Sequence, residues 1–321
     1  MIKLEYNDLQ CEEHYLAVKP VIKRRIENVL LGISRATVVN GRRNGPKAPM
    51  ILDVELIGFL NNLLIDAELR KLITAKPHDL AAVITYVRAH HPNFFQNGHD
   101  SNYVIKNIFI DHAYKNLEKW DFIQRVRLDS CPYCNRAYIY SLSKQGEIKP
   151  QIDHFYPSSL YPLLAVSFYN LIPSCQTCNG FGAKEEKDPI TEDLINPYLI
   201  VHEDFKFTYE ILNINVINPL TDAKSVKVKF INKKDGHLKV FKLDQLYEKH
   251  TDHVLEMIIK SKLKYTDVYR TYLKKYKKLR FSDDEIDRMI LGNYSLVDDM
   301  HKRPFAKLYQ DIGRELGLIN S

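Results

Sequence analysis

Two pairs of cysteines with the same spacing constrain this chain more than any other feature. The pairs are Cys131 with Cys134 and Cys175 with Cys178, while the fifth cysteine, Cys11, lies apart from them. The first residues carry no apolar block of the secretory kind, so we expect a cytoplasmic protein whose two C-x₂-C pairs bind zinc. Four thiolates fill every position of a tetrahedral zinc ion, so this zinc is expected to be structural.

The two pairs are separated by an unusually long segment. It holds 40 residues between Cys134 and Cys175, against roughly 15–20 in a compact zinc ribbon. The segment contains Asp153 beside His154 near the end of an expected strand. Neighbouring side chains on a strand point to opposite faces, so one can bind a metal while the other acts on a water molecule. A carboxylate together with an amide such as Asn179 provides the oxygen ligands that suit Mg²⁺.

Residues of this segment and of the second cysteine pair match the motif of a known family. They are Asp153, His154, Asn170, Cys175, Cys178, Asn179 and Lys184. The pattern resembles that of the HNH endonucleases, which implies a ββα-metal core built from an antiparallel hairpin and a helix around one divalent ion.

The resemblance also implies a role for each matching residue. His154 would be the general base, Asp153 and Asn179 would bind Mg²⁺ or Mn²⁺, and Asn170 would brace the loop that orients the imidazole. Lys184 and Lys187 are expected to contact phosphate. The flanking residues resemble, more loosely, HNH proteins of bacterial anti-phage defence, such as the nuclease subunit of Septu-type systems. That likeness implies a partner ATPase or another defence-system subunit.

The net charge is modest, but its distribution is uneven. The chain has 46 Lys and Arg against 40 Asp and Glu, a net charge of +6. The segment Lys260–Arg280 alone holds nine basic residues and one acidic residue. Because ordinary helix surfaces mix both signs, we expect this segment to contact the phosphates of a nucleic acid, with DNA favoured over RNA. The contacts are assigned to Lys274, Lys275, Lys277, Lys278 and Arg280.

The hydrophobic pattern predicts an α+β protein in three regions. Residues 1–128 form a helical region, with apolar residues at three and four spacing in Val18–Ile33, Ile51–Ile73 and Leu80–Val87. Residues 129–200 would be the HNH core that the resemblance implies, with the Cys₄ zinc site. Residues 201–321 form a small β-meander followed by a basic helical region.

The strands expected in these regions follow from local alternation. A hairpin is predicted from Tyr138–Leu142 and Ile148–Phe155, joined through Ser143–Glu147. The meander consists of Phe205–Tyr209, Val226–Ile231 and Leu238–Phe241. A helix is predicted over Ile259–Leu279.

The sequence therefore predicts a metal-dependent endonuclease, and two other functions stay open. One is a non-catalytic, zinc-stabilised module that binds nucleic acid or protein. The other is a dithiol oxidoreductase, which requires a reactive thiolate in one cysteine pair. The longest apolar stretches are far shorter than the roughly 20 residues that span a bilayer, so no membrane partner is expected.

Overall fold

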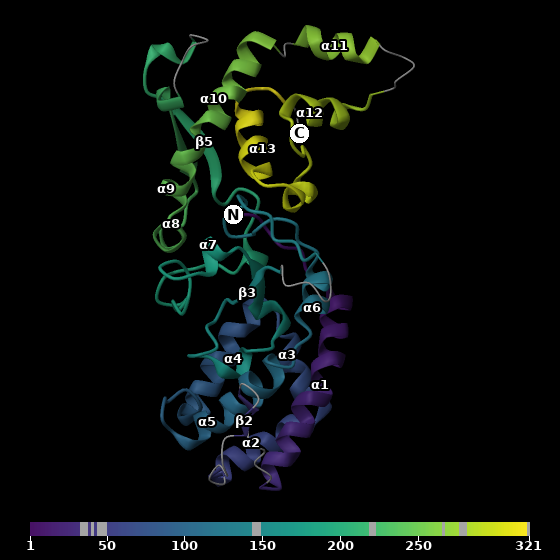
Figure 1. Ribbon diagram of the computed structural model, residues 1–321, viewed down its shortest axis with the longest axis vertical. Coiled ribbons are helices and arrows are strands. Elements are labelled where there is room, and N and C mark those ends of the chain that lie inside the picture. Colours follow the sequence, from purple (N-terminus) through teal and green to yellow (C-terminus); the bar gives the residue numbers. More distant parts are fainter. Residues whose placement is uncertain are drawn as a thin grey trace.

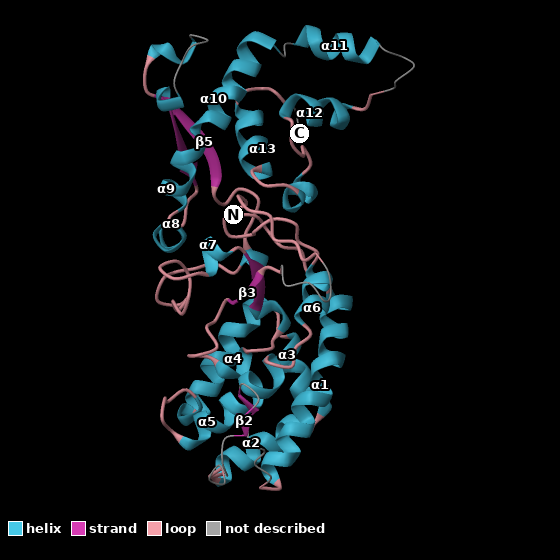
Figure 2. Cartoon of the chain, viewed as in Figure 1, coloured by secondary structure: helices cyan, strands magenta, loops and turns pink. Residues whose placement is uncertain are grey.

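The computed structural model describes residues 1–32, 38–39, 42–43, 50–142, 149–217, 223–264, 267–275 and 281–319. The molecule is elongated, with helices α1 to α5 at one end, helices α10 to α13 at the other, and strand β3 with helix α7 between them (Figure 1). The predicted mixture of helices and small sheets is confirmed (Figure 2).

The N-terminal part is mainly helical. Its elements are α1 (Asp8–Leu30), a strand pair of β1 (Val38–Val39) and β2 (Arg42–Arg43), α2 (Val54–Leu64), α3 (Asp66–Thr74), α4 (Pro77–His90), α5 (Asp100–Lys106), a π-helical segment (Asn107–Tyr114) and α6 (Lys119–Val126). The Asn7 side chain caps α1 by accepting a hydrogen bond from the Gln10 amide at 3.0 Å. The three predicted helices are confirmed as α1, as α2 with α3, which meet at Ile65, and as α4, while the predicted end of the first at Ile33 lies outside the described residues.

The central sheet is a strand pair whose partners differ from those predicted. Strand β3 (Gln151–His154) is antiparallel to β4 (Leu171–Ser174), and helix α7 (Gln176–Asn179) follows and packs on β3. The hairpin predicted with Tyr138–Leu142 is therefore wrong, and its turn at Ser143–Glu147 lies outside the described residues. Local alternation located β3, but a partner strand beyond a long loop leaves no signature in that alternation.

The meander is also smaller than predicted. Strands β5 (Lys206–Ile211) and β6 (Val226–Ile231) are antiparallel, whereas Leu238–Phe241 belongs to helix α8 (Asp235–Phe241). The residues that α8 buries are His237, Val240 and Phe241, a three and four spacing that suits a helix. Over so short a segment this spacing is easily mistaken for the alternation of a strand.

The C-terminal part is helical. Its helices are α9 (Leu243–Tyr247), α10 (Thr251–Ile259), α11 (Asp267–Lys275), α12 (Asp283–Leu291) and α13 (Ala306–Glu315). Of the helix predicted over Ile259–Leu279, the structure describes a π-helical segment at Lys260–Lys264 and then α11, while residues 265–266 and 276–279 lie outside the described residues. Helix α12 begins with a reciprocal cap between Ser282 and Glu285 and ends at Gly292, whose φ of 71° is left-handed.

Two hydrophobic clusters form most of the core. The larger joins the N-terminal helices to the cysteine pairs and to the residues around β3 and β4. The smaller packs β5 and β6 against α10, α12 and α13. The division of the chain at residues 128 and 200 stays a prediction. None of the described helices combines the length and the apolar character that crossing a membrane requires.

Candidate active site and cysteine cluster

The four paired cysteines meet in one buried cluster. Their sulfur atoms all lie within 4.8 Å of one another, and the Sγ atoms of Cys134 and Cys175 are 3.8 Å apart. All four are free thiols. Thiolates about 2.3 Å from a tetrahedral zinc ion lie roughly 3.8 Å from each other, so the cluster could hold zinc with little rearrangement.

Backbone hydrogen bonds shape the loops that carry these cysteines. The Cys131 amide donates to the Ala137 carbonyl at 2.9 Å, and the Arg136 amide donates to the Cys134 sulfur at 3.4 Å. Cys175 immediately precedes α7 and Cys178 lies within it. A metal in the cluster would therefore tie the first loop to α7 and fix the start of the segment that follows this helix.

His154 ends β3 with one ring nitrogen held by the backbone. Its Nε2 lies 3.0 Å from the Ala165 carbonyl oxygen, which can only accept, so Nε2 carries the hydrogen and Nδ1 keeps its lone pair. Burial, together with the charges of Lys184 and Lys119 and against the effect of the hydrogen bond to Ala165, lowers the pKa of the imidazole to about 4. The ring is therefore neutral at pH 7, and Nδ1 can accept a proton.

Asn170 is buried and braces the loop that holds His154. Its Oδ1 accepts from the Tyr156 amide at 2.8 Å, and its Nδ2 donates to the carbonyls of Tyr156 at 3.2 Å and Leu164 at 2.9 Å. Leu164 directly precedes Ala165, whose carbonyl orients the imidazole. The amide of Asn170 thus fixes both ends of this loop with three hydrogen bonds.

Asp153 is buried in a network that leaves no place for a second cation. Its side chain is 2% exposed, its Oδ2 accepts from the Tyr133 hydroxyl at 2.5 Å, and its Oδ1 faces the Lys184 ammonium at 3.4 Å. Burial raises the pKa of the carboxyl, while Lys184 and Tyr133 oppose that rise. A divalent ion bound to this carboxylate would meet the lysine charge at close range, so Asp153 does not fit the predicted Mg²⁺ or Mn²⁺ site.

Asn179, the other predicted metal ligand, is the last residue of α7 and is partly buried. The turn after it returns the chain to β3, because the Lys184 amide donates to the Cys178 carbonyl at 3.1 Å and its ammonium donates to the His154 carbonyl at 3.0 Å. The apex of this turn carries Phe181, whose side chain is 97% exposed.

The predicted phosphate contacts are only partly available. Lys184 is fully buried and paired with Asp153, so it is not placed to meet a phosphate. Lys187 is partly buried and donates to the Ala183 carbonyl. Lys274 pairs with Asp283 of α12 at 2.5 Å, and Lys275 is exposed. The remaining three residues, Lys277, Lys278 and Arg280, lie outside the described residues.

Acidic residues of a neighbouring helix offset part of the basic segment. Like Lys274, Arg270 forms an ion pair with α12: its guanidinium lies 2.6 Å from the Asp287 carboxylate. Counting charges along the sequence missed these partners, since they follow the basic segment instead of lying inside it.

The structure adds site residues that the sequence did not indicate. The Tyr133 hydroxyl donates a hydrogen bond to Asp153, and the centroid of the Tyr114 ring lies 4.5 Å from the centroid of the His154 ring. Lys119 lies 4.8 Å from the Tyr114 ring centroid. Tyr114 and Lys119 belong to the helical region before the first cysteine pair, so no spacing inside the HNH-like motif could reveal them. The Tyr133 position inside the first C-x₂-C pair was the one available signal.

A second cluster of possible metal ligands consists of His250, Asp252 and His253. The Nε atom of Arg136 donates to His250 Nε2 at 3.0 Å. This hydrogen bond occupies the Nε2 lone pair that a metal would need, and it places the positive charge of Arg136 beside the cluster. This cluster is therefore poorly suited to bind a cation.

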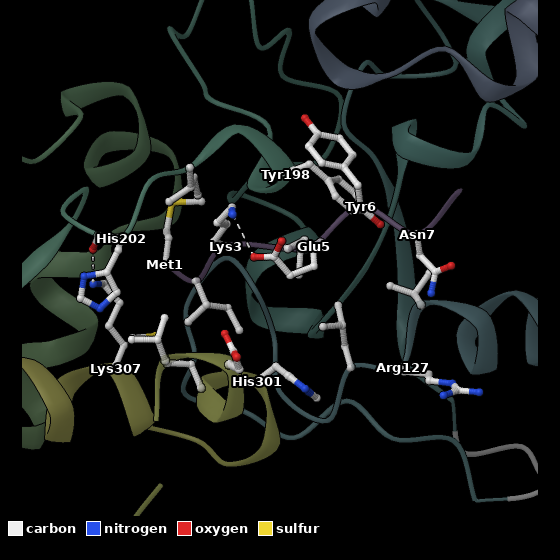
Figure 3. Close-up of a pocket in the computed structure, with 18 of the residues that line it drawn as sticks. Met1, Lys3, Glu5, Tyr6, Asn7, Arg127, Tyr198, His202, His301 and Lys307 are labelled. Atoms are coloured by element: carbon white, nitrogen blue, oxygen red, sulfur yellow. Dashed lines mark hydrogen bonds and ion pairs between the residues drawn. The ribbon is translucent and has the colours of Figure 1, made fainter. Parts of the chain in front are cut away.

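A cavity of about 260 Å³ lies away from His154, between the N-terminal segment and the C-terminal region. Figure 3 shows Met1, Tyr6, His202, His301 and Lys307 around it. No predicted catalytic or zinc residue is among the described residues that line it. The cavity is therefore separate from the candidate active site.

Comparison with known proteins gives two partial similarities. The chain is 33% identical over 107 residues to the Septu protein PtuB of Bacillus thuringiensis, an alignment that covers 29% of this chain and 39% of PtuB. It is 31% identical over 102 residues to the protein ea31 of Escherichia phage lambda, covering 31% of this chain and 30% of ea31. No family model and no solved structure matches the chain. The chain is thus distantly similar to a Septu protein, and the alignment spans well under half of either relative.

Proposed function

We propose that this chain is an HNH-type endonuclease that hydrolyses phosphodiester bonds in nucleic acid and acts in bacterial anti-phage defence. The observation that carries the proposal is the state of His154: Nε2 donates to a backbone carbonyl and Nδ1 is left as a base. The order of β3, β4 and α7, two antiparallel strands and a short helix, supports it as well.

The proposed reaction uses His154 as the general base. Nδ1 takes a proton from a water molecule, the water oxygen attacks phosphorus, and the bond to the leaving oxygen breaks. The leaving oxygen takes a proton from solvent. No step is assigned to a divalent ion, because Asp153 is engaged by Tyr133 and Lys184. Zinc held by the four cysteines would contribute to the fold alone, since every coordination position is filled.

The role in defence rests on the similarity to PtuB. In the proposal, the chain is the effector of such a system and works beside a partner subunit, for which an ATPase is the first candidate. Loss of phage protection in cells that carry His154→Ala in place of the native chain would support this role. Unchanged protection would contradict it.

The nuclease proposal is tested with purified, zinc-containing protein on supercoiled plasmid and on total RNA. Each substrate is incubated in Mg²⁺, in Mn²⁺ and in EDTA, beside the His154→Ala variant. We expect scission by the wild type that the variant lacks, with DNA cut faster than RNA. The EDTA reaction measures whether a divalent ion is needed.

A non-catalytic binding module is the second candidate. The buried pair of Asp153 and Lys184 favours it, because a metal-dependent nuclease would keep this carboxylate open to the ion. Such a module predicts nucleic-acid or protein binding that EDTA does not affect, and no scission under any of the conditions above.

A further inference from the structure

One aromatic ring connects the candidate base to a lysine of another region. The Tyr114 ring meets the His154 ring at a centroid distance of 4.5 Å and an angle of 61°, and the Lys119 ammonium lies 4.8 Å from the centroid of the same ring. Lys119 is the first residue of α6, and Tyr114 ends the π-helical segment before it. Both are therefore positioned by the N-terminal helices and not by the strand pair that carries His154.

Lys119 has no acidic partner within the part of the chain that the structure describes. It is partly buried, and its pKa is lowered, first by that burial and then by the charge of Lys149. Lys115, four residues earlier, is different: its ammonium pairs with the Asp111 carboxylate at 2.5 Å. Among the described residues, no carboxylate therefore compensates the charge of Lys119, in contrast to Lys115.

A partly buried ammonium group is unfavourable unless an anion compensates its charge. A phosphate would do so with charge-assisted hydrogen bonds, and it would lie close to the imidazole whose Nδ1 is free to act on water. The cation–π contact with Tyr114 compensates this charge only in part.

We propose that Lys119 binds the phosphate group of the nucleic acid that is cut beside His154. The identity of the anion rests on the proposed nuclease function. The binding of phosphate itself does not require cleavage, so the two can fail separately.

The test measures how salt weakens the binding of a fluorescent DNA duplex, followed by anisotropy. All proteins carry His154→Ala so that the duplex stays intact. Each phosphate contact contributes about 0.9 to the slope of log affinity against log salt concentration. We expect Lys119→Met to reduce this slope by about 1 and to weaken binding about threefold more at 50 mM than at 200 mM salt.

The controls separate charge from packing. Lys119→Arg keeps the charge and should keep the slope, whereas Lys115→Met removes a paired lysine and should leave the slope unchanged. Lys119→Gln provides a second uncharged variant if Lys119→Met unfolds, and it should also lower the slope. Thermal melting of each variant establishes that it is folded.

The outcomes distinguish failure of the Lys119 phosphate site from failure of the proposed nuclease function. If the wild-type chain cuts DNA while Lys119→Met keeps the full slope, the phosphate site is wrong and the nuclease stands. If the wild-type chain neither cuts nor binds nucleic acid, both are overturned. A reduced slope in a chain that cuts nothing would support the phosphate site and contradict the nuclease.

Discussion

At the level of single residues, the protonation state of His154 determines what the candidate site can do. The folded pKa is about 4, below the ordinary value of 6.5, so the base form persists throughout the neutral range. Activity that needs this base should stay constant down to about pH 5 and decline below it as Nδ1 takes up a proton. The measurement is kcat/KM against pH on a labelled duplex. An acid limb centred near 6.5 would contradict the environment described for this histidine.

The buried pair of Asp153 and Lys184 gives a second prediction at this scale. Replacing Lys184 by Met leaves a carboxylate buried without its cation, which should lower the free energy of unfolding by about 3 kcal/mol. The matched variant Lys187→Met removes a partly buried lysine and should cost less than about 1 kcal/mol. Urea denaturation of both variants measures the difference.

A different result for Lys184→Met would support the phosphate contact that was predicted for Lys184 from the sequence. If Lys184→Met kept wild-type stability and lost affinity for nucleic acid, Lys184 would be a phosphate contact that the described conformation hides.

At the level of elements, the helices of the first region could be predicted because each carries its own signal. Helix α1 repeats apolar residues at three and four spacing, and Pro77 begins α4. The partner of β3 could not be predicted, because β4 lies beyond a loop of irregular structure. The apolar residues of a short segment such as α8 fit both the helical repeat and the alternation of a strand. Only packing against the rest of the chain then decides between helix and strand.

In the candidate site, too, features within one segment could be predicted and contacts between distant segments could not. The spacing of the cysteines and the Asp153 and His154 pair could be recognised along the chain, because motif residues lie within one segment. The partners that set their chemistry could not. Tyr114 and Lys119 come from the helical region, and the ion pair of Asp153 with Lys184 depends on a turn that folds back onto β3.

The cysteine loops and α7 carry a prediction about metal content. Purified protein should contain one zinc ion per chain, and Cys134→Ser should lose it together with several degrees of thermal stability, because the ion links two separate loops. Cys11→Ser should keep the zinc, since Cys11 lies outside the cluster. Elemental analysis and melting curves test both variants. Full zinc content in Cys134→Ser, or none in the wild type, would contradict a Cys₄ site.

At the level of the whole molecule, the central region depends on the N-terminal helices. His14 of α1 donates through Nε2 to the Val166 carbonyl at 2.8 Å, and the Ser167 hydroxyl donates to the Leu72 carbonyl at 2.8 Å. Phe168 packs against Phe122 of α6. The loop that orients His154 is therefore covered by helices of another region.

This dependence predicts the behaviour of a fragment. Residues 129–200 expressed alone, with zinc supplied, should lack cooperative unfolding, because the apolar side chains that pack on α1, α3 and α6 would face water. Thermal melting followed by circular dichroism tests this. A fragment that melts cooperatively and binds one zinc ion would show that the core folds independently of the helices.

The proposed role of His154 as the base of a phosphodiester hydrolase is tested by single-turnover cleavage of an end-labelled duplex. The wild type is compared with His154→Ala and with His78→Ala, whose histidine lies on the surface far from β3 in the sequence. We expect a rate lowered at least about 100-fold in His154→Ala and unchanged in His78→Ala. Equal cleavage by all three proteins would contradict it.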